Sequence, residues 1–465
     1  MLIRDAEISG RRTDVRVAAG RVQELGDLTR QPGEEVVDGS GGVLLSGLTD
    51  HHVHLFAWAA ALRSAACGPP AVRDAHALRR ALAAASPDAA GWVRGVGYTE
   101  SVAGELDAAA LDRLHAERPV RLQHRGGSLW MLNTAAIRLL RLERSDDPGI
   151  ERAADGRPTG RVWRADHLLR PPSASSAVPY PDLTAVAGML ARWGVTAVTD
   201  ASPDLGEAAV SALTAQMEHR TLPQRVRLLG APCGAVLRCP RLTPGPWKIV
   251  VRDDALPGLA ELVATIGSAH ARARPVALHC LTVDALALSL AAFDEAGSIP
   301  GDRIEHAGVV PDWCLGPLRR HGLRVVTQPA FLADRGEDMV AGTPAGEEDF
   351  LYRYAGLRDA GVRVFPSSDA PYGPADPWRV MAAARDRTTE SGRVIARAER
   401  VGVAVTLNGY LTPGELPLSG PAVLRPGIAA DLVLLRGGLR EVLAEPDAER
   451  VRLTMIDGRV VHQAP

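Results

Sequence analysis

The segment GLTDHHVHL places Asp50, His52 and His54 in an Asp-x-His-x-His arrangement. On a β-strand, residues two apart point to the same face of the sheet, so both imidazoles can reach one metal ion. A chain with 13 histidines can contain such a pair by chance, so spacing alone does not define a site. The position adds weight, because the motif ends a predicted strand, and barrel enzymes keep their sites at the carboxyl ends of strands.

Further candidate ligands occur at the ends of other predicted strands. His279 ends RPVALHC, His306 ends DRIEHA, and Asp369 follows the strand in VRVFPSSDA. Each histidine alone is more often a satisfied polar residue near a loop than a metal ligand. Together, these imidazole and carboxylate groups predict a site for one or two divalent ions, with zinc as the first candidate and Mn, Co, Ni or Fe as alternatives.

Lys248 is the single lysine of a chain with 53 Lys and Arg residues. A lysine amine can lose its proton and act as a nucleophile, whereas an arginine guanidinium stays protonated. The residue lies in GPWKIVV, the fourth predicted strand of the series below. Either the presence of a lysine in this strand is accidental, or the protein requires the chemistry of a lysine at this position.

Strands and helices alternate through most of the chain, which predicts an α/β fold with a (β/α)8 TIM-type barrel. A long stretch, residues 56–183, follows the first barrel strand and predicts an inserted subdomain. It contains the helical pattern ALRRALAAA, the strand pattern VRLQH, and the Pro/Ser-rich PPSASSAVPYP, which would lead back to the barrel. The predicted barrel strands are residues 48–54, 195–200, 225–229, 247–251, 275–280, 303–306, 323–328 and 362–367.

Both chain ends consist of short strand patterns divided by glycine-bearing turns. Neither end alone offers enough strands for a stable sheet. The sequence therefore predicts one β-sandwich formed by residues 1–45 and 406–465, outside a barrel domain that spans residues 46–405.

Composition limits the classes of partner. The net charge of −2 provides no basic field for nucleic acid, so a small-molecule substrate is predicted. The first residues lack the apolar core of a secretory signal, and no apolar run approaches the ~20 residues of a membrane span. Five scattered cysteines suggest no disulfide framework, which favours a cytoplasmic location. A homodimer is compatible with these observations.

The chain resembles the amidohydrolase superfamily, and within it amidohydrolase family 3, the YtcJ-like branch, over essentially its whole length. The resemblance implies that His52, His54 and Asp369 hold one metal ion and that His279 and His306 hold a second. It also implies that Lys248, carboxylated by carbon dioxide, bridges the two. The matching segments are GLTDHHVHL, HRGGSLWMLNTAAI, DGRPTGRVWRADHLL, GVTAVTDA, GPWKIVVRDD, DRIEHAG, VTQPAF, SSDAPYG with DPWRVM, and GIAADLVLL with VRLTMIDGRVV.

The resemblance implies hydrolysis of a C–N bond in an N-acyl or N-formyl amide, a carbamate or a cyclic amide. Two divalent ions that share a water lower its pKa from ~15.7 toward neutrality. Asp369 would take the proton of that water as a general base. Candidate substrate contacts come from the insert, although each is equally well interpreted as a core aromatic or a solvated arginine: Tyr98, Trp130, Arg161 and Trp163.

Two alternatives stay open. A mononuclear deaminase of the same superfamily would share the histidines and the aspartate but would not need Lys248. A non-catalytic scaffold on the same fold would tend to lose ligands, and none of the six is missing here. Glu305, next to His306, could orient that ligand. Strand alternation points it to the opposite face, so a structural pair is the favoured interpretation.

Overall fold

The structure of the protein is a computed structural model that describes residues 1–169, 180–235, 237–414 and 420–464. The chain divides into two compact units. The larger one combines Met1–Leu55 with Asp182–Pro465, and the smaller one is Phe56–Pro181. The Pro/Ser-rich segment that was predicted to lead back to the barrel lies almost entirely outside the described residues.

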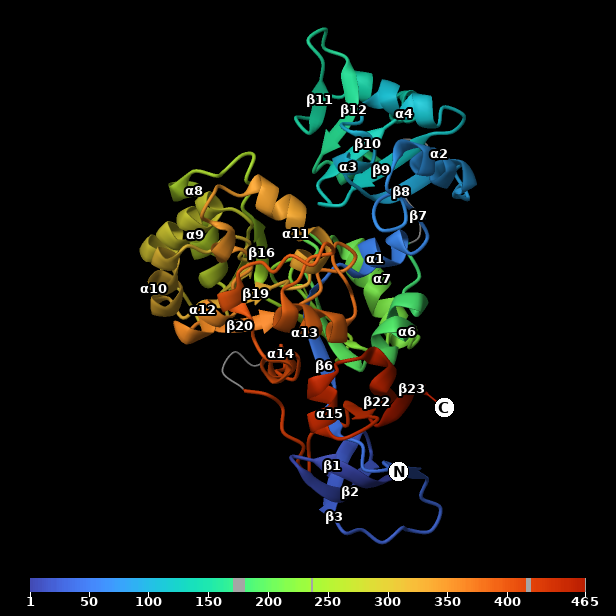
Figure 1. The fold of residues 1–465 in the computed structure, drawn as a ribbon, viewed down its shortest axis with the longest axis vertical. Coiled ribbons are helices and arrows are strands. Elements are labelled where there is room, and N and C mark those ends of the chain that lie inside the picture. Colours follow the sequence, from blue (N-terminus) through green and yellow to red (C-terminus); the bar gives the residue numbers. More distant parts are fainter. Residues whose placement is uncertain (170–179, 236, 415–419, 465) are drawn as a thin grey trace. The chain divides into compact units, whose positions relative to one another are not determined.

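Parallel strands form the centre of the larger unit, and a strand occurs at each of the eight predicted places (Figure 1). They belong to two sheets with the orders β15-β14-β13-β6 and β16-β17-β18-β19-β20, in which all neighbours are parallel. A short strand that was not predicted, β15 (Leu242–Pro244), adds an edge to the first sheet. The eight are β6 (Leu48–Val53), β13 (Val195–Asp200), β14 (Arg225–Leu228), β16 (Trp247–Val250), β17 (Val276–Cys280), β18 (Arg303–His306), β19 (Arg324–Thr327) and β20 (Arg363–Pro366).

Backbone hydrogen bonds connect the two sheets on two sides. On one side, the backbone N–H of Lys248 donates to the carbonyl of Leu229 at 3.1 Å. On the other side, the N–H of Asp369 donates to the carbonyl of His52 at 2.9 Å, and Val53 forms a parallel bridge with Ala370. This mixed α/β arrangement is consistent with a TIM-barrel-type fold.

Helices follow the strands and bury their apolar faces against them. The helix α9 shows how the sequence sets its bounds: the side chain of Thr282 accepts the N–H of Ala285 at the start, and Gly297, with a φ of 73°, ends it. The helices of this unit are α6 (Thr184–Arg192), α7 (Glu207–Glu218), α8 (Leu259–His270), α9 (Val283–Ala296), α10 (Asp312–Arg320), α11 (Phe331–Gly342), α12 (Ala355–Asp359), α13 (Pro377–Asp386), α14 (Val403–Tyr410) and α15 (Leu439–Ala444).

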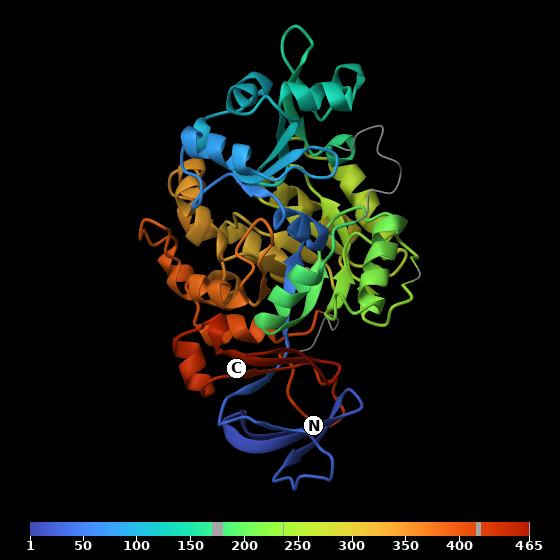
Figure 2. The same cartoon turned by 90° about the vertical axis from the view of Figure 1, so that its right-hand side faces the viewer.

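The two chain ends contribute two further sheets, which lie side by side in Figure 2. Their orders are β3-β2-β1-β4 and β23-β22-β21-β5, and β5 pairs with β21 antiparallel. Ile3 and Val15 share one hydrophobic cluster with Leu432 and Met455, so residues from both ends pack together. The strands are β1 (Leu2–Ile8), β2 (Arg11–Ala18), β3 (Arg21–Gly26), β4 (Val36–Asp38), β5 (Leu44–Ser46), β21 (Leu432–Leu435), β22 (Val451–Ile456) and β23 (Arg459–Gln463).

The boundary predicted at residue 406 falls inside α14, which packs against β20 and β6. This helix therefore accompanies the parallel strands, and the C-terminal sheet begins after it.

The smaller unit contains one six-stranded sheet with the order β11-β12-β10-β9-β8-β7. The predicted helix ALRRALAAA corresponds to α2, and the predicted strand VRLQH is β9. Across the described residues, no helix combines the length and the apolarity that a membrane crossing requires. The elements from residue 55 to 169 are α1 (Leu55–Ala61), β7 (Ala65–Ala66), α2 (Ala75–Ala84), β8 (Val93–Tyr98), α3 (Glu100–Ala103), α4 (Ala108–Leu114), β9 (Val120–His124), β10 (Leu129–Leu132), α5 (Thr134–Leu140), β11 (Ile150–Arg152) and β12 (Pro158–Trp163).

Candidate metal centre

Three of the predicted ligands converge at the carboxyl ends of the parallel strands. One donor atom each from His52, His306 and Asp369 lies within 4.8 Å of the others, and all three side chains are buried. The Nε2 atom of His52 is 3.4 Å from Oδ1 of Asp369. Strands β6 and β18 supply the histidines, and the aspartate lies three residues after β20. Residues more than 300 positions apart in the chain thus form one cluster.

The other predicted ligands surround this group. Nε2 of His54 lies 3.2 Å from Oδ1 of Asp369, and the ring of His279 lies 4.5 Å from the ring of His306, centroid to centroid. The Lys248 side chain is buried as well, and its strand, β16, pairs with β17, which carries His279. All six residues predicted as ligands therefore lie in one region of the larger unit.

The backbone of Lys248 lies further from the carboxyl ends of the strands than the backbone of His279. In the register between β16 and β17, Lys248 lies beside Ala277, whereas His279 lies beside Val250. A rise of about 3.3 Å per residue places the lysine backbone roughly 6.6 Å below that of His279. The long lysine stem can cover this difference, which a shorter acidic side chain at the same position would not.

The backbone is unusual where the cluster forms. His306 has a φ of 69°, Ala307 of 48° and Asp369 of 55°, all in the left-handed region that side chains other than glycine rarely adopt. Such residues tend to gather at functional sites, where the surrounding structure holds them in place. The N–H of Asp369, bonded to the carbonyl of His52, is part of that support.

The protonation states of His52, His306 and Asp369 favour the binding of a cation. Burial, together with the charge of Lys248, holds the pKa of His52 well below its usual range, and burial lowers the pKa of His306 to about 3. Both imidazoles are therefore neutral donors at pH 7. Burial opposes ionisation of Asp369, yet the hydrogen bond with His54 and the charge of Lys248 hold its pKa below its usual value, so it is ionised.

The buried polar atoms that remain without a hydrogen bond test the fit of a metal ion. Within the described part of the chain, Nε2 of His52, Oδ1 of Asp369 and Nζ of Lys248 have no hydrogen-bond partner. Such atoms are costly inside a protein unless something binds them. Two of them are preferred ligand types for divalent transition metals and belong to the same cluster, so these residues fit a metal ion.

Glu305 does not have the position that strand alternation predicted. One of its carboxylate oxygens contacts Nδ1 of His52, and the other forms an ion pair with Nε of Arg303; both His52 and Glu305 are fully buried. The expectation of a structural pair is correct for Arg303, but the expectation that Glu305 points away from the ligands is wrong. The positive φ of His306 is the reason, because it breaks the alternation at the end of β18 and lets both side chains face the cluster.

Two further residues orient ligands and were not singled out by sequence reasoning. The hydroxyl of Ser202 lies 3.3 Å from Nδ1 of His54, and Oε1 of Gln328 lies 3.0 Å from Nδ1 of His306. Gln328 directly follows β19, and Ser202 lies two residues after the end of β13; this position near a strand end was the signal that could have identified them. Together with Glu305, they leave the Nε2 atoms of three histidines available to a metal ion.

The four predicted substrate contacts all lie in the smaller unit. Tyr98 is buried and donates its hydroxyl to the carbonyl of Gly104, and Trp130 donates Nε1 to Asp166 at 2.9 Å. Contact of these residues with a substrate stays a prediction, and their partners within the unit favour a structural role. The same holds for the other pair: Arg161 forms ion pairs with Glu105 and Glu151, and Trp163 donates to Glu151.

Replacement of Glu305 by glutamine is expected to weaken metal binding by about 10- to 100-fold, because His52 loses the charged group that fixes its ring. Metal affinity, measured by competition with a chromogenic chelator, checks this expectation. Glu399→Gln is a matched control, since Glu399 is also buried and paired with an arginine, Arg353, but contacts none of the candidate ligands. Equal affinities in the two variants would contradict an orienting role for Glu305.

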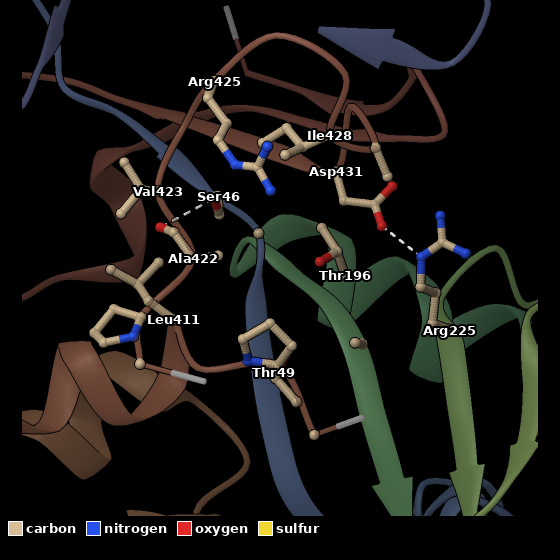
Figure 3. A pocket seen from close by; sticks show the side chains of 17 residues that line it. Ser46, Thr49, Thr196, Arg225, Leu411, Ala422, Val423, Arg425, Ile428 and Asp431 are labelled. Carbon is tan, nitrogen blue, oxygen red and sulfur yellow. Dashed lines mark hydrogen bonds and ion pairs between the residues drawn. The ribbon is translucent and has the colours of Figure 1, made fainter. Parts of the chain in front are cut away.

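A hollow at the other end of the strands is a separate feature. Figure 3 shows this pocket, which is lined by residues at the start of β6, β13 and β14, such as Thr49, Thr196 and Arg225. Because the strands are parallel, their amino ends lie opposite the carboxyl ends that carry His52 and His306. The pocket in Figure 3 therefore does not belong to the candidate metal centre.

Comparison with known proteins identifies the class. The model of the amidohydrolase family matches residues 35–462. An uncharacterized metal-dependent hydrolase from Pyrococcus furiosus is similar in structure, with a TM-score of 0.69, 21% sequence identity, and coverage of 93% of this chain and 97% of the other. A second one, from Pyrococcus horikoshii OT3, has a TM-score of 0.72 at 19% identity and covers 99% of this chain and 98% of its own. The chain belongs to the amidohydrolase family.

A more distant match is N-isopropylammelide isopropylaminohydrolase from Burkholderia multivorans ATCC 17616. Its TM-score is 0.53 at 18% identity, with 99% of this chain and 98% of the other covered. At these identities the structural likeness shows a shared fold. A search of the curated proteins found no match. Membership of the family supports a hydrolase.

Proposed function

We propose that the protein is a metal-dependent amidohydrolase that cleaves a C–N bond in an N-acyl or N-formyl amide, a carbamate or a cyclic amide. The observation that carries the proposal is the cluster of His52, His306 and Asp369, whose side chains are buried and have donor atoms within 4.8 Å of one another. Membership of the amidohydrolase family supports the reaction class. One structural neighbour is an isopropylaminohydrolase, whose name describes the hydrolytic removal of an isopropylamino group.

Six residues would hold the metal ions in this proposal. His52, His54 and Asp369 would hold one ion, His279 and His306 a second, and Lys248, as a carbamate formed with carbon dioxide, would bridge them. A bound divalent ion supplies Lewis acidity toward the scissile carbonyl and lowers the pKa of water. Zinc is the preferred candidate, because it favours imidazole and carboxylate donors.

Asp369 has the properties of the proton carrier. Its pKa is held below the usual value, so the carboxylate is ionised and can accept a proton, and its Oδ1 has no hydrogen-bond partner within the described residues. We assign to it the transfer of a proton from the attacking water to the leaving nitrogen. The rings of His52 and His54, held by Glu305 and Ser202, keep the position of this oxygen fixed.

The proposal also covers the arrangement of the domains. We infer that the two parallel sheets form one closed eight-stranded barrel, because backbone hydrogen bonds join β16 to the end of β14 and the segment after β20 to β6. Residues 1–45 and the segment after α14 would form a β-sandwich around their shared hydrophobic cluster. Residues 56–183 would form the inserted subdomain. The substrate would be a small molecule in the cytoplasm.

A substrate screen tests the function. The purified protein, loaded with zinc or manganese, is expected to hydrolyse at least one compound among N-acyl amines, formamides, carbamates and hydantoin-like rings. Release of the amine, followed by mass spectrometry, identifies the bond that breaks. Activity should disappear on treatment with a chelator and return when the divalent ion is added back, because the ligand cluster needs a cation to act.

Two results would count against this proposal. Full activity in a preparation that elemental analysis shows to be free of metal would exclude a metal-dependent reaction. Release of ammonia from aminated purines or pyrimidines, with one metal ion per chain, would instead identify the mononuclear deaminase.

A further inference from the structure

A second pocket at the amino ends of the strands has a different character from the metal centre. It has a volume of about 350 Å³, within the range of small-molecule sites. Arg303 and Arg324 line it from the first positions of β18 and β19, and Pro275 and Pro300 lie just before β17 and β18. The candidate ligands lie at the carboxyl ends of the same strands, so the pocket is at the opposite ends. Arg303 links the two places, because it pairs with Glu305, which contacts His52.

Five arginines line the pocket, and the lining residues that the structure describes include neither aspartate nor glutamate. They are Arg227, Arg272, Arg274, Arg303 and Arg324. Two of them are held by uncharged oxygens: Arg274 donates to the carbonyls of Leu229, Ala231 and Gly245, and Arg272 to Ser268. Backbone carbonyls satisfy the hydrogen bonds but leave the positive charge in place. Arg303 is paired with Glu305.

Arg324 is a buried arginine of this pocket with an unsatisfied donor group. Only 8% of it is exposed, and within the described chain its Nη2 has no hydrogen-bond partner. The Cζ atom of the guanidinium lies 5.8 Å from the centroid of the Phe365 ring, so one face of the guanidinium is directed toward this ring. A buried guanidinium with an unused N–H group is costly unless an acceptor binds it.

The register of the sheet concentrates positive charge around Arg324. Arg303 lies beside Arg324 on one side, and Arg363 lies beside it on the other, so three arginines form a row across adjacent parallel strands. Neighbouring strands are about 4.8 Å apart, and like charges at that spacing repel. Burial, and then the charges of Arg363, Arg303 and Arg227, lower the pKa of Arg324 to about 10, so it stays protonated at neutral pH.

The neighbouring pocket, drawn in Figure 3, shows how a carboxylate can neutralise an arginine at the start of a strand. There, Arg225 is also at the start of a strand, but Nε of Arg225 lies 2.6 Å from a carboxylate oxygen of Asp431. The same arginine also pairs with Asp457. A protein carboxylate thus neutralises that arginine, whereas the described residues around Arg324 provide none.

We propose that the pocket around Arg324 binds a small phosphoryl anion, either inorganic phosphate or the phosphate group of a small metabolite. The planar guanidinium donates two parallel hydrogen bonds to an oxyanion, and a phosphate dianion offsets more of the excess charge than a carboxylate does. The walls formed by prolines fix the shape of the pocket, because proline restricts the backbone. This site is independent of the proposed hydrolytic function.

Titration calorimetry of the full chain, loaded with metal, tests the site with inorganic phosphate as the probe. Sodium chloride of equal ionic strength gives the reference. We expect saturable binding of phosphate, and Arg324→Gln should raise its Kd by about tenfold or more, because a charge-assisted pair of hydrogen bonds is lost. Arg324→Lys, which keeps the charge and is less disruptive to the fold, should also weaken binding, since an ammonium lacks the planar fork.

Arg11→Gln is the matched control, because it removes the same charge from an exposed position on β2 and should leave phosphate binding unchanged. A parallel titration with glycerol 3-phosphate separates the two sources: tighter binding than that of phosphate indicates a metabolite, and equal binding indicates the free ion. Absence of binding beyond that of chloride would overturn the proposal. So would equal Kd values for the wild type, Arg324→Gln and Arg324→Lys, because phosphate would then bind elsewhere, such as at the metal ions.

Discussion

The variant Lys248→Arg is expected to lose the second metal ion and to lower turnover by more than about 100-fold, although it preserves the positive charge. Loss of a residue that only orients a ligand costs up to about 100-fold, and loss of a bridging ligand should cost more. Elemental analysis gives the number of ions per chain, and initial rates on the substrate found by the screen give the turnover.

The environment of Lys248 explains why arginine cannot replace it. Burial lowers the pKa of the lysine amine, although Glu305 and Asp369 attract its charge and oppose this shift. A lower pKa populates the neutral amine, which can add to carbon dioxide and release one proton to become a carbamate. The guanidinium of arginine stays protonated and cannot react. It would bring a fixed cation to the place where the negative bridge is required.

The deeper position of Lys248 allows a rescue experiment. Lys248→Ala leaves a space from β16 up to the ligands, and short carboxylic acids such as acetate or propionate should occupy it and restore part of the activity. Arg324→Ala, another truncation of a buried cationic side chain on the parallel strands, should show no such rescue. Full activity in Lys248→Arg, or an unmodified ammonium in a metal-loaded crystal structure, would refute the carbamate and favour a mononuclear site.

The parallel strands could be predicted because most of them are short apolar runs, and several, such as β13, β18 and β19, end in a polar residue. Both faces of such strands are covered, so their sequences are continuous rather than alternating, and their position in the chain is plain. The candidate ligands followed from the same observation. His52, His279 and His306 each stand at or near the end of one run, and parallel strands bring those ends to one edge.

The environment of the ligands could not be predicted in the same way. Strand alternation assigned Glu305 to the wrong face, because the left-handed conformation of His306 depends on contacts that no local pattern encodes. The choice of Ser202 and Gln328 as partners of His54 and His306 depends on distances between strands. The order of the six strands in the smaller unit is likewise set by long-range pairing.

The variant Asp369→Asn is expected to retain metal but to lose turnover by about 10²- to 10⁴-fold, the usual contribution of a general acid or base. Asparagine keeps the size of the side chain and one oxygen that can face His52 and His54. It cannot accept and return a proton, because an amide oxygen is a very weak base. Metal content and the turnover number, measured on the same preparation, separate the two effects.

Asp50 provides the matched control for Asp369, since both aspartates are buried within the same group of strands. Oδ1 of Asp50 accepts the N–H groups of His52 at 3.1 Å and Ser368 at 3.2 Å, so this side chain ties β6 to the segment that carries Asp369. Burial raises the pKa of Asp50 to about 7, and the amide of Asp50→Asn closely mimics its protonated form and keeps the accepting oxygen. Asp50→Asn should therefore keep most of the activity that Asp369→Asn loses. Similar losses in both variants, with metal retained, would mean that the two carboxylates act on the fold alone and that the proton carrier is a different group.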